Sequence, residues 1–162
     1  MSVNRFKPHI FVLPEDRANE EIANGFIQAE NINFRAIQIE RIANGWGKVV
    51  EKFNEQLVPE MRKFAEGLAV LLLDFDEHED RLNYVMSQIP EDLKDRVFVL
   101  GVFSEPEQLK RKRKMTFEEI GNSLAKDCPF KRNELWEDAL LKNNETELNR
   151  LILSVKQFLF EV

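Results

Sequence analysis

An unbroken apolar run, LAVLLL at residues 68–73, is followed at once by Asp74, Phe75 and Asp76. A strand that helices cover on both faces of a parallel sheet shows such a continuous run instead of an alternation of apolar and polar residues. We therefore predict that residues 68–73 form a central parallel strand with two carboxylates at its carboxyl end.

Three further segments are predicted to be strands of the same sheet. HIFVL (9–13) and VFVLGVF (97–103) are apolar runs, whereas FRAIQIERI (34–42) alternates with period two, as expected near a sheet edge. Residues 18–29, 46–64 and 82–93 carry apolar side chains at helical spacing. The predicted fold class is α/β, with a short, mainly parallel four-stranded sheet in the order βαβαβαβ and helices on both faces.

The rest of the chain is predicted to be a helical C-terminal tail. Ser104 with Glu107 and Thr116 with Glu119 have the spacing of capping boxes, so we expect helices to start at both places. A length of 162 residues with 43% hydrophobic content suits one domain. We predict a single domain over 1–162, with an α/β core at 6–104 and a helical extension at 105–162.

Composition narrows the function classes. One cysteine, Cys128, excludes an internal disulfide, and with only two histidines a Cys/His zinc site is not expected. The apolar run near the N-terminus is too short for a signal peptide or a membrane span, so we expect a cytoplasmic protein without a membrane partner. A net charge of −6 argues against coating of nucleic acid by the whole surface and leaves a local basic site open.

Acidic residues follow three of the four predicted strands. Asp74 and Asp76 are two residues apart on a strand leaving the core, so their side chains are expected on one face with α-carbons about 7 Å apart. Glu15 and Asp16 follow the first strand, and Glu105 follows the fourth. Because two nearby carboxylates repel each other unless a cation lies between them, the pattern predicts a Mg²⁺ or Mn²⁺ site at this rim.

A simpler interpretation stands beside the metal site. Asp and Glu are also favoured at helix N-caps and first turns, where they satisfy free amides and the positive end of the helix dipole. This alternative explains each acidic residue singly, and it is favoured for Glu105 and Glu107 because Ser104-x-x-Glu107 accounts for their spacing.

Basic residues suggest two possible contacts with phosphate. The run KRKRK comprises Lys110, Arg111, Lys112, Arg113 and Lys114, and we consider it a candidate contact for nucleic acid. Its alternative role is a solvated helix face. Lys48, in Gly45-Trp46-Gly47-Lys48, is a further candidate rim residue, although the P-loop spacing is missing.

The order βαβαβαβ, with Leu13-Pro14-Glu15-Asp16 after the first strand and Leu72-Leu73-Asp74-Phe75-Asp76 after the third, resembles the TOPRIM domain. That domain is shared by topoisomerases, primases, recombination-repair proteins and overcoming-lysogenization-defect nucleases. The resemblance covers about residues 6 to 104. It implies that Asp74 and Asp76 hold Mg²⁺, with Glu15 as general acid/base or as a further ligand.

The resemblance implies phosphodiester cleavage or transfer on nucleic acid, with a protein partner or a second copy of the chain as further expected partners. Tyr84 is expected in the core, which disfavours topoisomerase activity. Asp16 stands where the family usually has glycine, so a non-cleaving relative stays open. The alternatives are a catalytically silent α/β binding or assembly module, and a receiver-type or nucleotide-binding domain in which Asp74 is an acceptor or ligand.

Overall fold

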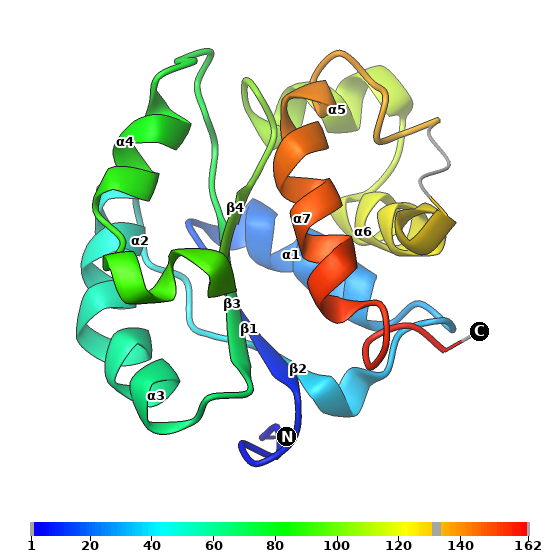
Figure 1. Ribbon diagram of the computed structural model, residues 1–162. Helices are drawn as coiled ribbons and strands as arrows, with labels where there is room; N and C mark the ends of the chain where they lie inside the picture. Colours follow the sequence, from blue (N-terminus) through cyan, green and yellow to red (C-terminus); the bar gives the residue numbers. More distant parts are fainter. Residues whose placement is uncertain (1, 131–133, 162) are drawn as a thin grey trace.

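The sheet contains four parallel strands in the order β2-β1-β3-β4 (Figure 1). The computed structural model describes residues 2–130 and 134–161. Its strands are β1 (His9–Pro14), β2 (Ile37–Ile39), β3 (Gly67–Leu72) and β4 (Val97–Leu100). The predicted α/β class is confirmed, and β3 lies inside the sheet between β1 and β4.

Alternate residues of each strand face two different helical layers. In β1, Phe11 and Leu13 pack into one core cluster, whereas Ile10 and Val12 pack into the other. The first layer contains α2 (Trp46–Lys52), the π-helical turn η2 (Phe53–Leu57), α3 (Val58–Lys63), α4 (Arg81–Ser87) and η3 (Glu91–Arg96). The second contains α1 (Arg17–Ile27), α6 (Phe117–Asp127) and α7 (Glu145–Val155).

The C-terminal segment completes the second layer of the fold. After β4 come α5 (Pro106–Arg113), α6, η4 (Cys128–Phe130), η5 (Lys142–Asn144) and α7. Leu148 and Leu151 of α7 are buried in the cluster that holds Phe98 and Leu100 of β4. The segment that was predicted as an extension of the core therefore covers one face of the sheet.

Helices α1 and α6 approach each other closely through two glycines. A β-carbon at Gly25 would lie 2.0 Å from the Glu118 carbonyl oxygen, and one at Gly121 would lie 1.8 Å from the Ile22 carbonyl oxygen. Only residues without a β-carbon allow this crossing. The contact fixes α1, whose N-terminal turn reaches the acidic rim described below.

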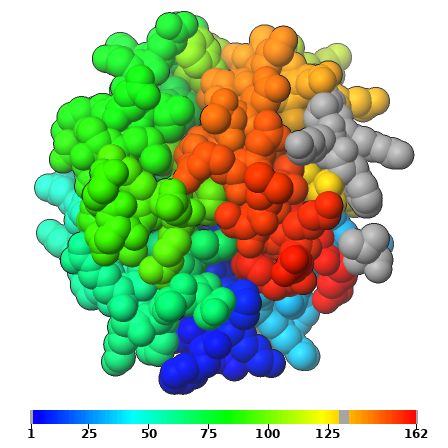
Figure 2. All heavy atoms as spheres, in the orientation of Figure 1, coloured from blue at the N-terminus to red at the C-terminus, as the bar shows by residue number. Residues whose placement is uncertain are grey.

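Side chains of the C-terminal segment form hydrogen bonds with the backbone groups at the outer edge of β4 and just after it. The Val99 amide donates to Glu147 Oε1 at 2.9 Å, and the Gly101 amide donates to Asn144 Oδ1 at 2.9 Å. The Asn144 Nδ2 donates back to the Gly101 carbonyl. In the space-filling view, orange residues of α7 lie directly against the green part of the chain (Figure 2). An edge strand whose polar groups are paired in this way offers no template for a further strand.

Replacing Glu147 with alanine is expected to lower the free energy of unfolding by about 1–3 kcal/mol, because the buried Val99 amide loses its acceptor. Urea unfolding followed by circular dichroism measures the change. Glu145→Ala, at an exposed position of the same helix, is the control and should cost less than about 1 kcal/mol. Equal losses in the two variants would contradict the role given to Glu147.

Several element boundaries differ from the prediction. Residues 34–42 form a strand only over Ile37–Ile39, because Asn33 accepts a bond from the Arg35 amide and caps a 3-10 turn instead. The helix at 46–64 is divided by η2, and α3 starts with Pro59 in its first turn, where no amide donor is needed.

One of the two predicted capping boxes is present. Thr116 and Glu119 exchange both bonds at the start of α6, as predicted. The Ser104–Glu107 box is wrong, because the N-cap of α5 is Glu105 and the Ser104 hydroxyl donates to Gln108 Oε1. Within residues 2–130 and 134–161, no helix has the length and hydropathy needed to cross a bilayer.

Candidate functional site at the acidic rim

Glu15, Asp16 and Asp74 meet at the carboxyl ends of β1 and β3, and we call them the acidic trio. One carboxylate oxygen from each lies within 4.8 Å of the others. The register explains this meeting: Pro14 pairs with Leu72, so the residues that follow the two strands emerge side by side. The Asp74 amide donates to Glu15 Oε1 at 3.1 Å, across 59 residues of sequence.

Asp16 has two roles at the start of α1. It is the helix N-cap and accepts from the Asn19 amide at 3.1 Å. Its backbone is extended, with φ of −146°, which any residue adopts, so no glycine is required at this position. The cap orients its carboxylate toward Asp74, and the residue that was predicted only as an additional rim group becomes a member of the trio.

Asn19 joins two members of the trio. Its Nδ2 donates to Asp16 Oδ1 and to Asp74 Oδ1, both at 3.0 Å, and the residue is almost fully buried. Asn19 was not among the predicted site residues. The sequence did indicate that Asn19 faces inward, because Asn19, Ile22 and Phe26 share one helix face at spacings of three and four residues.

Burial of Asp74 makes its negative charge unfavourable. The side chain is buried, and this desolvation raises the pKa of Asp74 to about 8, with contributions from the negative charges of Asp16, Glu15 and Glu107. The bond from Asn19 acts in the opposite direction. In the part of the chain that the structure describes, no lysine or arginine forms an ion pair with Asp74.

Glu15 shows the same trend. Burial raises the pKa of its carboxyl group, the hydrogen bond from the Asp74 amide lowers it, and the charges of Asp16 and Asp76 raise it again. Arg81 provides the compensating positive charge nearby. Glu15 therefore has an environment that holds a proton more readily than free glutamate does.

Asp76 lies outside the acidic trio, contrary to the predicted Asp74/Asp76 pair. β3 ends at Leu72, and Asp76 and Glu77 adopt left-handed backbone conformations with φ of 47° and 61°. The period-two geometry assumed for the pair is therefore lost. The Asp76 carboxylate accepts instead from Arg81 Nη1 at 3.1 Å, and its side chain is half exposed.

Arg81 links this loop to the trio, and it too was not among the predicted site residues. The same Nη1 donates to the Asp74 carbonyl at 2.7 Å, and the guanidinium carbon lies 4.5 Å from the ring centre of Trp46. Arg81 is the first residue of α4 and directly follows the acidic run DEHED (76–80). From the sequence alone, it therefore reads only as a positive charge that balances these acidic residues.

The remaining predicted rim residues lie at the margin. Glu105 is exposed as the N-cap of α5, whereas Glu107 is close enough to Asp74 to raise the pKa of that carboxyl group. Lys48 is exposed and pairs with Glu51 at 3.1 Å. None of these three belongs to the acidic trio.

Two residues of the basic run form ion pairs with a carboxylate of the protein itself. Lys112 and Arg113 bind the buried Asp138 carboxylate at 2.9 and 2.7 Å. Burial tends to raise the pKa of Asp138, but bonds from the Leu140 amide and from these two cations outweigh burial and lower it. The amine of Lys110 lies 4.8 Å from the ring centre of Phe117, while Arg111 and Lys114 are exposed.

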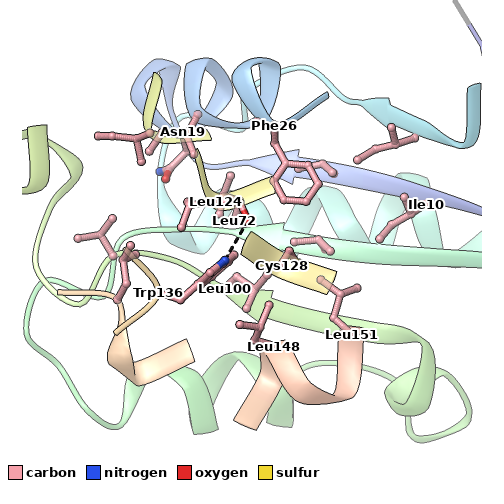
Figure 3. Close-up of a pocket in the computed structure, with 18 of the residues that line it drawn as sticks. Ile10, Asn19, Phe26, Leu72, Leu100, Leu124, Cys128, Trp136, Leu148 and Leu151 are labelled. Carbon is pink, nitrogen blue, oxygen red and sulfur yellow. Dashed lines mark hydrogen bonds between the residues drawn. The ribbon is translucent and has the colours of Figure 1, made fainter. Parts of the chain in front are cut away.

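The inner side of the acidic rim is apolar. A cavity of about 90 Å³ lies between the sheet and α1, α6 and α7, with Asn19 at one end (Figure 3). Its other lining residues include Phe26, Leu72, Leu124 and Cys128. A cavity lined in this way stays dry, so nothing on this side solvates a charge on the rim.

The donor set of the trio suits a hard divalent cation, since carboxylate oxygens are the ligands that Mg²⁺ and Mn²⁺ take in proteins. Comparison with protein-family models, curated proteins and solved structures found no significant match. The chemistry of this site therefore has to be inferred from its own residues, above all from a buried carboxyl group that meets two others without an ion-pair partner in the described chain.

Proposed function

We propose that the protein carries out Mg²⁺-dependent phosphodiester cleavage or nucleotidyl transfer on nucleic acid, as a TOPRIM-like domain. The observation that supports this most is the meeting of Glu15 with Asp74 and Asp16 at the ends of two adjacent parallel strands. Open α/β sheets bind their ligands at the carboxyl ends of the strands, which is where the trio lies.

The residues present fit a divalent ion. Asp74 and Asp16 are the proposed ligands, because their oxygens converge and the amide of Asn19 orients both of them. A bound Mg²⁺ or Mn²⁺ supplies charge stabilisation for the phosphate that reacts. Its positive charge would also offset the burial and the repulsion that otherwise favour the protonated form of Asp74.

Glu15 is the proposed proton carrier. A general acid or base works best when its pKa lies near the working pH, and burial raises the pKa of Glu15 in that direction. Its Oε1 accepts from the Asp74 amide, which fixes the carboxylate beside the proposed ligands. Arg81 keeps positive charge next to Glu15 and Asp76, where it can balance an incoming phosphate.

A catalytically silent binding or assembly module is the second candidate. It is favoured by Asp76, which is bound to Arg81 instead of joining the trio, and by Asp16, whose position is also explained by helix capping. A receiver-type domain is less well supported, because side chains of the C-terminal segment occupy the outer edge of β4, where a fifth strand would pair.

Labelled single- and double-stranded DNA and RNA are incubated with the protein, either with excess Mn²⁺ or with EDTA. The comparison separates the two candidates. We expect strand cleavage or transfer with Mn²⁺ that is lost with EDTA and in Asp74→Ala. Glu79→Gln, at an exposed acidic position outside the trio, should retain activity. Equal activity in wild type and Asp74→Ala, or none with any substrate despite bound Mn²⁺, would favour the silent module.

A further inference from the structure

An open groove lies between α2 and α4, on the first helical layer. Its volume is about 550 Å³. The residues that line it come from the turn before α2, from α2 and from α4: Gly45, Trp46, Gly47, Lys48, Val50, Glu51, Tyr84 and Gln88. This volume is within the range of pockets for nucleotide-sized ligands.

Two aromatic rings form one wall of the groove. Trp46 and Tyr84 are in edge contact, with ring centres 5.5 Å apart and planes at 80°. Tyr84 was expected in the core, but the residue is 52% exposed, which leaves its ring accessible from solvent. Gly47 also lines the groove, and no atom lies within 4 Å of the place where its β-carbon would be.

The groove is tied directly to the acidic trio. The amides of Asn44 and Gly45 donate to the Glu15 carbonyl at 2.7 and 3.3 Å. On the other side, Arg81 packs on the Trp46 ring and donates to the Asp74 carbonyl. The turn before α2 and Arg81 therefore connect the groove to the backbone of Glu15 and Asp74, two members of the acidic trio.

We propose that the groove holds an unpaired nucleobase whose phosphate lies at the acidic trio. This inference rests on the proposed function and specifies its substrate class. Exposed aromatic rings stack on bases of any sequence, because every base has a π face. Beside the rings lie Gln88, whose side-chain amide can donate and accept, and the Lys48–Glu51 ion pair, so the groove also offers polar groups to the edge of a base.

The same geometry favours a single-stranded substrate over a duplex. In a duplex, both faces of each base are covered by its neighbours, so a base reaches an aromatic wall only when it is unpaired or flipped out. The sugar-phosphate backbone of a duplex has no planar face to offer Tyr84. The substrate class is therefore a single strand, a frayed end or a free nucleotide, each of which presents the same base chemistry.

Fluorescence anisotropy of a labelled six-nucleotide dA strand, with Ca²⁺ as the ion, tests the inference. A labelled strand of the same length without bases is the comparison probe. We expect the dA strand to bind more tightly than the abasic strand, and Tyr84→Ala to weaken dA binding by about tenfold or more without changing abasic binding. Tyr84→Phe should retain most of the affinity, because it keeps the ring.

Phe34→Ala is the matched control. Phe34 is as exposed as Tyr84, at 53%, and has Arg35 over its ring, but it precedes β2 at the opposite end of the sheet. It should leave dA binding unchanged. Equal affinity of wild type for the dA and abasic strands, no effect of Tyr84→Ala, or a preference for duplex would each overturn the groove assignment.

A separate Mn²⁺ titration by calorimetry distinguishes this inference from the proposed function. If Mn²⁺ binds but the dA and abasic strands bind equally well, the groove assignment is wrong and the proposed function is not affected. If Mn²⁺ does not bind while base-dependent affinity and its loss in Tyr84→Ala persist, the metal chemistry fails and the groove assignment holds. Binding of free AMP as tight as that of the dA strand would support the groove and identify a nucleotide as its ligand.

Discussion

Asp74→Asn is expected to make the metal-free protein more stable and to abolish Mn²⁺ binding. The pKa of Asp74 is about 8 in the folded protein, against an ordinary value of 3.8. Between these values the folded protein keeps a proton that the unfolded chain has released, so stability falls as the pH rises through this window and levels off above it. Asparagine does not ionise and still offers Oδ1 to Asn19.

The stability difference between Asp74→Asn and wild type should therefore grow between about pH 4 and pH 8, by at most ~1.4 kcal/mol per pH unit. Urea unfolding in EDTA across this range measures it. Glu79→Gln, an exposed carboxylate, should show no such growth. A variant that is less stable than wild type at pH 8 would mean that the Asp74 carboxylate is favourable without metal.

Mn²⁺ should reverse the order of stability. It is expected to raise the Tm of wild type, more at pH 8 than at pH 6, because the ion has to displace the proton of Asp74. In Asp74→Asn the loss of affinity should exceed the ~10–100-fold that is typical when only an outer partner of a ligand is changed. Differential scanning calorimetry with and without Mn²⁺ provides both comparisons.

Gly121→Ala is expected to destabilise the fold strongly. The added carbon would lie 1.8 Å from the backbone oxygen of Ile22, so α1 and α6 have to move apart. Overpacking of this kind costs about 1–3 kcal/mol and occasionally more. Because α1 carries Asn19 and is capped by Asp16, its displacement should also weaken Mn²⁺ binding.

Gly47→Ala is the matched control for this substitution. It lies in the first turn of α2 and meets no atom within 4 Å, so alanine should be neutral or should raise stability by about 0.5–1 kcal/mol. Thermal unfolding by circular dichroism compares the two variants. Similar Tm values for Gly121→Ala and wild type would show that the two helices are not held at the distance described.

The central strand and the meeting of Glu15 with Asp74 were predictable for one reason. Carboxyl ends of parallel strands gather at one edge, and the run at residues 68–73 identifies the strand next to β1. The place of Asp16 in the trio was only partly predictable. In the structure, the Asp16 carboxylate that caps α1 also points toward Asp74. A capping pattern in the sequence predicts the cap but not this direction.

Other features depended on contacts that the local sequence does not record. Asp76 turns away because two non-glycine residues adopt left-handed backbone conformations, for which no glycine gives a signal. Lys112 and Arg113 pair with Asp138, which lies 26 and 25 residues further along the chain. Tyr84 was expected in the core, but it lines the groove, where its ring is in edge contact with Trp46.

The most direct test of the metal site is an anomalous difference map from crystals soaked in MnCl₂. Our account predicts a peak within bonding distance of carboxylate oxygens from Asp74 and Asp16, beside Glu15, that is absent in Asp74→Asn crystals. Saturating Mn²⁺ that leaves no peak at these residues, or a peak that persists in Asp74→Asn, would contradict it.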